Sequence, residues 1–230
     1  MEFDVQRSVL TPGDADYQTV SNLFLRKEKG HFPPLEIQSI EAVQNYSLQQ
    51  RFKEKKDEYE RAYGRVDVIK LWHGTKSSRV SSILQNNFDV SRYCGHRYGA
   101  GVSFTASPKY ASHYCDKGTI GCILLCDVLV SNIVEVPENI GKDYVLEKPP
   151  FIPGVYPPLR YDTTAKNKKT MNVIVKFESN SYCPTHVVNF KRTRHARCNV
   201  GGSRKNTVKP KVRYPTYPYP VELNNPFLDN

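Results

Sequence analysis

Three common patterns are missing from this sequence of 230 residues. It has no uninterrupted apolar run of about 18 residues, so we expect no transmembrane helix and no membrane partner. Residues 1–4 have neither a basic nor an apolar segment, so we expect no secretory signal. No Gly-x-Gly-x-x-Gly motif opens a helix after a strand, so the usual dinucleotide-binding fingerprint is absent.

Cysteine is present, but not at the spacing of a metal site. None of the six cysteines forms a Cys-x-x-Cys pair, and no Cys/His set repeats at zinc spacing, so we expect no metal. Cys122 and Cys126 lie four residues apart in an apolar stretch, where a strand would bury both on one face. We therefore expect reduced thiols and a nuclear or cytoplasmic protein.

The positive charge is concentrated near the C-terminus. Residues 191–213 hold nine Lys or Arg and no acid, and residues 214–230 hold two acids. The net charge of +10 thus leaves 33 − 9 = 24 basic and 23 − 2 = 21 acidic residues, or +3, for residues 1–190. We expect one globular domain over 1–190 and a disordered, basic, Tyr- and Pro-rich tail over 191–230. The tail is a solvated segment, a nuclear-localisation signal, or a non-specific contact for nucleic acid.

Hydrophobic periodicity predicts many short strands and few helices. The expected helices begin at Thr11–Asp14, at Leu48 and at Ser107, with a short one over 80–84. The expected strands are 35–43, 66–71, 88–90, 102–105, 121–130, 173–177 and 186–190. Residues 135–159 are Pro-rich and irregular. Strands do not alternate with long helices, so we predict an α+β fold rather than a Rossmann fold.

The chain is organised around Leu71–Thr75, which reads Leu-Trp-His-Gly-Thr, followed about one helix later by the glycine turn Tyr98–Phe104. His73 and Gly74 fall where a strand should end, and we expect both to face a cleft. A glycine there would let a ligand approach the main chain. The alternative for this pair alone is a turn with a capped histidine.

The order of several motifs resembles the catalytic domain of the poly(ADP-ribose) polymerase family over roughly residues 10–190. It is most similar to the branch that transfers single ADP-ribose units and often follows CCCH zinc fingers. The motifs are Trp72–Thr75, Asn87–Asp89, Tyr98–Phe104, Ser107–Tyr114, Val128–Val130 and Tyr161–Thr164.

The resemblance implies an ADP-ribosyltransferase-like core, a split, mixed and antiparallel β-sheet with short flanking helices. It implies an NAD-dependent enzyme that transfers one ADP-ribose to a protein side chain, or to a nucleic-acid end, and releases nicotinamide. We expect a monomer that uses NAD and no metal.

The resemblance also implies roles for single residues. His73 holds a ribose hydroxyl, Gly74 holds the nicotinamide amide through its backbone, and Thr75 makes a second ribose contact. The alternative for Thr75, a helix N-cap, is compatible with this contact. Tyr114 stacks on nicotinamide, whereas Tyr110, a turn earlier, belongs to the core. The turn residues Tyr98, Gly99 and Phe104 complete the expected NAD site.

Three positions depart from the family pattern. Ser103 replaces a tyrosine that closes the nicotinamide pocket, and Ala111 replaces a serine that bonds the amide. Val173 replaces the catalytic glutamate of polymerising members, which orients the acceptor ribose. The third departure predicts a single-unit product. Together they favour the alternative, a non-catalytic domain that acts as an RNA-binding or scaffold protein.

A polar loop carries three basic candidates, Arg92, His96 and Arg97. In the family this loop borders the adenosine and pyrophosphate, and positive charge suits a diphosphate. The alternative is a solvated loop.

Overall fold

A computed structural model describes residues 5–26, 34–91, 97–139 and 145–193 of the chain. These residues belong to a compact unit, 1–195, and the second unit, 196–230, lies outside them. The basic run of the predicted tail therefore falls outside the described residues, apart from its first two members, Lys191 and Arg192.

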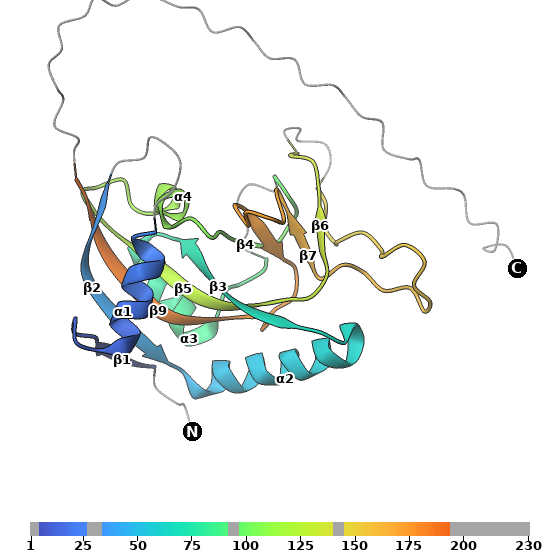
Figure 1. Cartoon of the computed structure of the whole chain (residues 1–230), viewed down its shortest axis with the longest axis horizontal. Coiled ribbons are helices and arrows are strands. Elements are labelled where there is room, and N and C mark those ends of the chain that lie inside the picture. Colours follow the sequence, from blue (N-terminus) through green and yellow to red (C-terminus); the bar gives the residue numbers. More distant parts are fainter. Residues whose placement is uncertain (1–4, 27–33, 92–96, 140–144, 194–230) are drawn as a thin grey trace, which may run out of the picture. The chain divides into compact units, whose positions relative to one another are not determined.

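A five-stranded antiparallel sheet forms the centre of the described fold (Figure 1). Its order is β1 (Gln6–Val9), β2 (Leu35–Gln44), β9 (Tyr182–Arg192), β5 (Ile120–Val130) and β3 (Asp67–Gly74). The strand predicted over 121–130 is β5, which lies between β9 and β3, and all of its residues except Ile120 and Asp127 are buried.

A smaller, mixed sheet of four three-residue strands lies beside it. Its order is β4 (Val102–Phe104), β8 (Ile174–Lys176), β7 (Thr163–Ala165) and β6 (Ile133–Glu135), and only the β6–β7 pair is parallel. A fully buried ion pair supports this sheet, because Lys176 Nζ lies 2.6 Å from Asp162 Oδ2. Two sheets, one antiparallel and one mixed, confirm the predicted α+β fold of the ADP-ribosyltransferase type.

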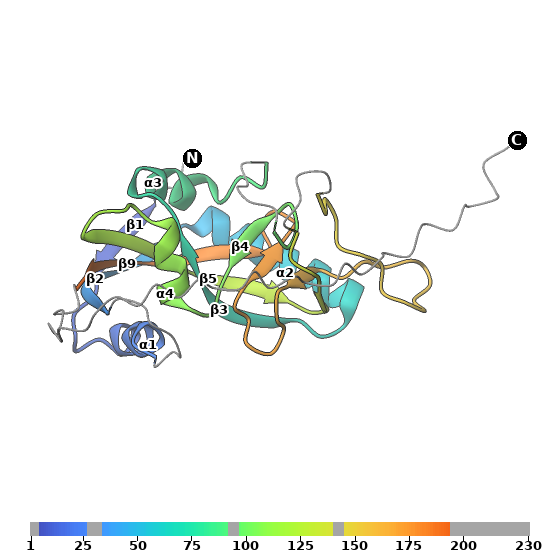
Figure 2. The same cartoon turned by 90° about the horizontal axis from the view of Figure 1, so that it is seen from above.

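Short helices cover both faces of the larger sheet. α1 (Ala15–Phe24) and α3 (Ser77–Asn86) lie on opposite faces (Figure 2). Alternate residues of β5 explain this, because Leu124 faces the cluster that includes α3 and Leu125 faces the cluster that includes α1. The remaining helices are α2 (Tyr46–Tyr63), α4 (Pro108–Ala111) and the 3₁₀ turn η1 (Ser112–Tyr114).

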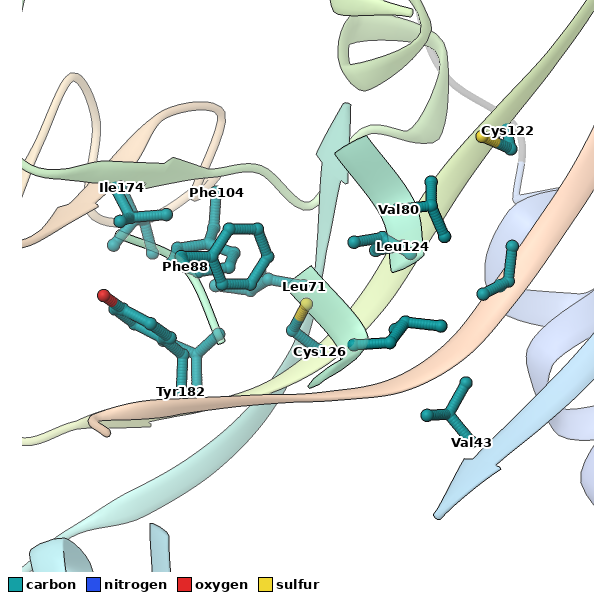
Figure 3. Packing of buried hydrophobic residues seen from close by; sticks show 14 of the residues in the cluster. Val43, Leu71, Val80, Phe88, Phe104, Cys122, Leu124, Cys126, Ile174 and Tyr182 are labelled. Carbon is teal, nitrogen blue, oxygen red and sulfur yellow. The ribbon is translucent and has the colours of Figure 1, made fainter. Parts of the chain in front are cut away.

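The core on the α3 face is partly aromatic (Figure 3). The ring of Phe88 packs edge-on against Tyr182 at 5.4 Å and against Phe104 at 5.6 Å between ring centroids. Cys122 and Cys126 are buried in the same cluster, as their spacing predicted. The four cysteines that the structure describes are all buried free thiols.

Several elements differ from the predictions. Residues 88–90 form no strand, because Asn87 adopts a positive φ of 68° after α3 and turns Phe88 into the core as a loop residue. The first helix begins at Ala15 with Asp14 as N-cap, not at Thr11. The strands β1, β6 and β7 were not predicted.

The predicted boundary at residue 190 falls inside a strand. β9 continues to Arg192, which pairs with Leu35 of β2. Thr193 then donates its backbone N–H to Pro34 O at 3.0 Å, an ordinary hydrogen-bond distance. Among the described helices, none is long and apolar enough to cross a membrane.

Candidate active site

His73 and Gly74 are the last two residues of β3, at the edge of the larger sheet. Trp72 packs beneath them, edge-on to Phe24 of α1 at 5.7 Å between centroids. Because side chains alternate along a strand, His73 points to the opposite face from Trp72. Its ring there lies 4.5 Å from that of Phe88 and 5.7 Å from that of Phe104.

One backbone contact fixes the chemical state of His73. Its Nδ1 lies 2.9 Å from the carbonyl oxygen of Ser103 in β4. Because a carbonyl can only accept, Nδ1 carries the proton and Nε2 keeps a free lone pair. Burial lowers the pKa of His73 to about 4, so the ring is neutral near pH 7. His73 can therefore accept a hydrogen bond from a hydroxyl group.

Gly74 is enclosed on the side where a side chain would stand. A Cβ at this position would lie 1.8 Å from the carbonyl oxygen of Ala111 and 3.1 Å from Cβ of Tyr114. The glycine is thus required by the chain's own packing against α4 and η1, and the space expected for a ligand on that side is occupied. Any approach to the Gly74 backbone has to come along the sheet edge.

The backbone of Gly74 presents a donor and an acceptor at that edge. Trp72 exchanges both of its backbone hydrogen bonds with Thr105, at 2.8 and 2.9 Å, on the side away from β5. Residues two apart in a strand point their N–H and C=O the same way, so those of Gly74 also point away from β5. On this side of β3, past the bridge between Trp72 and Thr105, no described residue forms a backbone hydrogen bond with Gly74. A primary carboxamide, with one acceptor and one donor, matches this pair.

Tyr114 provides an exposed ring next to this edge. Its side chain is 55% exposed, although its Cβ adjoins Gly74. Its hydroxyl lies 3.0 Å from that of Tyr110, and the two rings are tilted by 59° at 5.7 Å between centroids. An exposed aromatic face beside a free carboxamide partner suits a flat, amide-bearing ring.

Other predicted site residues lie behind this surface. The side chains of Phe104 and Ala111 are each 1% exposed, so they support His73 and Gly74 rather than present a contact surface. Thr75 is also buried, and the N-cap of α3 is Lys76, so the alternative role of Thr75 as helix cap is wrong. The ribose contact of Thr75 stays a prediction.

The turn before β4 is closed by the chain itself. Gly99 has a φ of 131°, and a Cβ there would lie 2.4 Å from the ring of Phe177. Tyr98 accepts a hydrogen bond from the Thr164 hydroxyl through its backbone oxygen, at 2.6 Å, and its side chain is 5% exposed. The turn is therefore tied to the second sheet.

Val173 joins the same region from the β8 side. It is buried in a cluster with Tyr98 and Val175, and Tyr110 packs against that cluster. Tyr110 therefore links the cluster of Val173 to Tyr114. Ser103 pairs with Val175 in β4–β8 and is exposed, so its side chain leaves an open position on that face.

Two contributors were missed or misplaced by sequence reasoning. Tyr110 was assigned to the core, but it also holds the Tyr114 hydroxyl. Arg192 was assigned to the tail, but it lies in β9 and bonds the loop that follows η1. The spacing of Tyr110 and Tyr114 by four residues could have indicated the first contact, whereas no local signal marks the second.

The basic loop is described only in part. Arg92 and His96 lie outside the described residues. Arg97 is described, and its guanidinium is bonded to Glu138 at 2.9 Å. Within the described chain no group of three or more His, Cys, Asp or Glu is placed to hold a metal ion.

Comparisons with known proteins point to one family. The family model described as Poly(ADP-ribose) polymerase catalytic domain matches residues 14–190. Protein mono-ADP-ribosyltransferase PARP12 of Homo sapiens is 30% identical over 191 residues, which make up 80% of this chain and 26% of that protein. Protein mono-ADP-ribosyltransferase PARP11 of Homo sapiens is 24% identical over 200 residues, or 76% of this chain and 56% of that protein. The chain thus spans about a quarter of the first relative and just over half of the second.

Proposed function

Because this chain belongs to the poly(ADP-ribose) polymerase catalytic domain family, we propose that it transfers one ADP-ribose unit from NAD to a protein side chain and releases nicotinamide. The observation that carries the proposal is the joint placement of three groups. They are the free backbone edge of Gly74, the exposed ring of Tyr114 and the acceptor nitrogen of neutral His73.

Each group suits one part of NAD. The Gly74 backbone matches the carboxamide of nicotinamide, and Tyr114 offers a stacking face for its ring. His73 Nε2 can accept a hydrogen bond from a ribose hydroxyl. These contacts would hold the bond between ribose C1′ and the nicotinamide nitrogen in a fixed place. When this bond breaks, both electrons go to nicotinamide, the nucleophilic atom of the acceptor forms the new bond to C1′, and the acceptor's proton is released to solvent.

We propose a single-unit product because of Val173. Elongation needs a group that orients the hydroxyl of an ADP-ribose already attached, and an apolar side chain in the Tyr98 cluster cannot do so. The two human relatives described above carry the name mono-ADP-ribosyltransferase, which supports the same reading.

Calorimetry with NAD and a labelled-NAD transfer assay test the proposed function. We expect wild type to bind NAD and to incorporate label into itself or into an added protein. No binding of NAD or of benzamide, a nicotinamide mimic, would refute the proposal. Binding without transfer would support the non-catalytic alternative that Ser103, Ala111 and Val173 suggest.

Location, oligomeric state and the tail also remain proposals. We propose a nuclear or cytoplasmic monomer, because the described cysteines are buried free thiols that suit a reducing compartment. We propose that the basic residues beyond Thr193 contact nucleic acid without sequence preference.

A further inference from the structure

The loop from Ser112 to Thr119, which begins with the turn η1, carries Tyr114 and is bonded at several points by one residue of β9. Arg192, at the end of β9, donates from Nη2 to Ser112 O at 2.7 Å. It donates from Nη1 to Asp116 O at 2.9 Å and to Gly118 O at 2.6 Å. Its backbone N–H bonds Thr119 O at 2.8 Å. Arg192 therefore contacts the loop at four carbonyl groups.

The guanidinium group is well suited to this arrangement. Its five N–H donors lie in one plane and are spread over three nitrogens, so they can reach acceptors that lie further apart than those around a single ammonium nitrogen. The group also lies over the ring of Phe190, 5.0 Å from its centroid, and that ring is fully buried. The orientation of Arg192 is thus set by the core.

The loop has a second anchor on the side of the candidate site. The carboxylate of Asp116 accepts the backbone N–H of Ser77, the first residue of α3, at 2.9 Å. Hydrogen bonds from the side chain and then the backbone N–H of Ser77 lower the pKa of Asp116, which stays charged at neutral pH. Ser77 comes three residues after Gly74, so Asp116 ties the loop to the segment that leaves β3.

Tyr114 depends on this loop for its position. More than half of the surface of Tyr114 is exposed, and its side chain contacts that of Tyr110 in the neighbouring helical turn. With little core packing of its own, the ring stands where the loop backbone places it beside Gly74.

We propose that Arg192 is a positioning residue for the nicotinamide end of the site. It holds the Ser112–Thr119 loop so that the ring of Tyr114 lies over the free edge of Gly74. The proposal rests on the proposed function, because it assigns nicotinamide to this surface. Arg192 touches no substrate; it acts through the loop backbone and Tyr114.

The test compares two ligands on Arg192→Met, Arg192→Lys and the matched control Lys191→Met. Lys191 is the exposed neighbour of Arg192 in the same strand. Benzamide probes the nicotinamide end and ADP-ribose probes the rest of the site. For Arg192→Met we expect the Kd for benzamide to rise about tenfold and the Kd for ADP-ribose to change less than about twofold. Arg192→Lys should be intermediate, and Lys191→Met should match wild type.

Three results would overturn the role of Arg192. The first is benzamide binding at wild-type strength by folded Arg192→Met, and the second is an equal loss of both ligands, which indicates general destabilisation. The third needs no ligand: amide hydrogen exchange over residues 112–119 that is unchanged in Arg192→Met and Arg192→Lys. This measurement separates the inference from the proposed function, which fails instead if wild type binds neither ligand. Should Arg192→Met not fold, Arg192→Lys decides by the same comparisons.

Discussion

At the scale of single residues, His73 shows how packing sets a protonation state. Its Nδ1 is hydrogen-bonded to the Ser103 carbonyl, and its ring packs against those of Phe88 and Phe104. The pair His73–Gly74 could be located from the sequence because its motif is local. The contact that fixes the histidine tautomer could not, because it joins residues thirty positions apart through a backbone atom.

The lowered pKa of His73 predicts a loss of stability in acid. The folded pKa of about 4 lies below the ordinary value of 6.5, so the unfolded chain binds the proton more readily between these values. Stability should therefore fall as pH drops from 6.5 towards 4, by at most about 3 kcal/mol from this residue. Denaturant unfolding at several pH values should show a steeper loss for wild type than for His73→Gln. Parallel curves for the two proteins would contradict the assignment.

The neutral state of His73 also predicts how NAD binding responds to pH and to mutation. Because the ring stays neutral above its folded pKa, NAD affinity should not change between pH 6 and 8 through this residue. His73→Ala should abolish the rise in melting temperature that NAD produces in wild type. A mutant that keeps the full rise would remove His73 from the site.

Ser103 is the residue whose substitution best distinguishes an intact NAD-binding site from one that has lost part of its pocket. It is exposed on β4, and its carbonyl is held by His73, so its side-chain position is well defined. Ser103→Tyr should add an aromatic wall and tighten NAD or benzamide binding by about 1–2 kcal/mol, roughly tenfold. Calorimetry of the two proteins measures this directly. Equal or weaker binding would mean that the side chains near Tyr98 and Tyr110 already fill the space.

At the scale of elements, the close packing of α4 and η1 against β3 predicts the effect of adding a methyl group at Gly74. Gly74→Ala would place Cβ 1.8 Å from a backbone oxygen, which no side-chain rotation can relieve. The helix must shift, which should cost about 3 kcal/mol and weaken benzamide binding through Tyr114. Gly13→Ala is the matched control, since its nearest neighbour would be 3.9 Å away. Denaturant unfolding that gives both variants the same stability would contradict the packing described for Gly74.

Hydrophobic periodicity predicted the elements that are long enough to repeat the pattern several times. β5 is a largely apolar strand of eleven residues that was predicted over 121–130, and α2 is an amphipathic helix of eighteen that was predicted to begin at Leu48. The strands β6 and β7 have three residues each and exist because β6 pairs with β7 and β7 pairs with β8. Phe88 was read as strand because an aromatic residue in a short apolar stretch fits a strand, whereas tertiary packing on Tyr182 decides its place.

At the scale of the whole chain, the end of β9 changes how a tail deletion should be designed. Cutting after residue 190 would remove the pairs of Lys191 and Arg192 with β2 and would free the loop below Tyr114. A cut after Thr193 keeps them, and takes away seven of the nine basic residues, since 9 − 2 = 7. We expect this truncated protein to keep the stability and benzamide affinity of full-length protein.

Nucleic-acid binding should distinguish the same two proteins. The full-length chain should bind single-stranded RNA weakly and without sequence preference, with log affinity falling by about 0.7 per phosphate contacted for each unit of log salt. The chain cut after Thr193 should lose most of this binding, because its remaining charge is spread over a nearly neutral body. Equal binding by both forms, measured by fluorescence anisotropy at two salt concentrations, would end the proposal for the tail.

The last prediction concerns the product, which depends on the side chain at position 173. Val173 sits just before β8, buried with Tyr98 and Val175, and no carboxylate occupies its position. A chain terminated after one unit is therefore expected from any transfer that occurs. Glu178, the acid nearest in sequence, has its carboxylate 3.4 Å from Nζ of Lys55 and is therefore directed towards α2. Mass spectrometry of the modified protein should find single ADP-ribose additions on each modified side chain. Polymer ladders on a gel would refute the role given to Val173, and Glu178→Gln would then show whether that acid moves into the site.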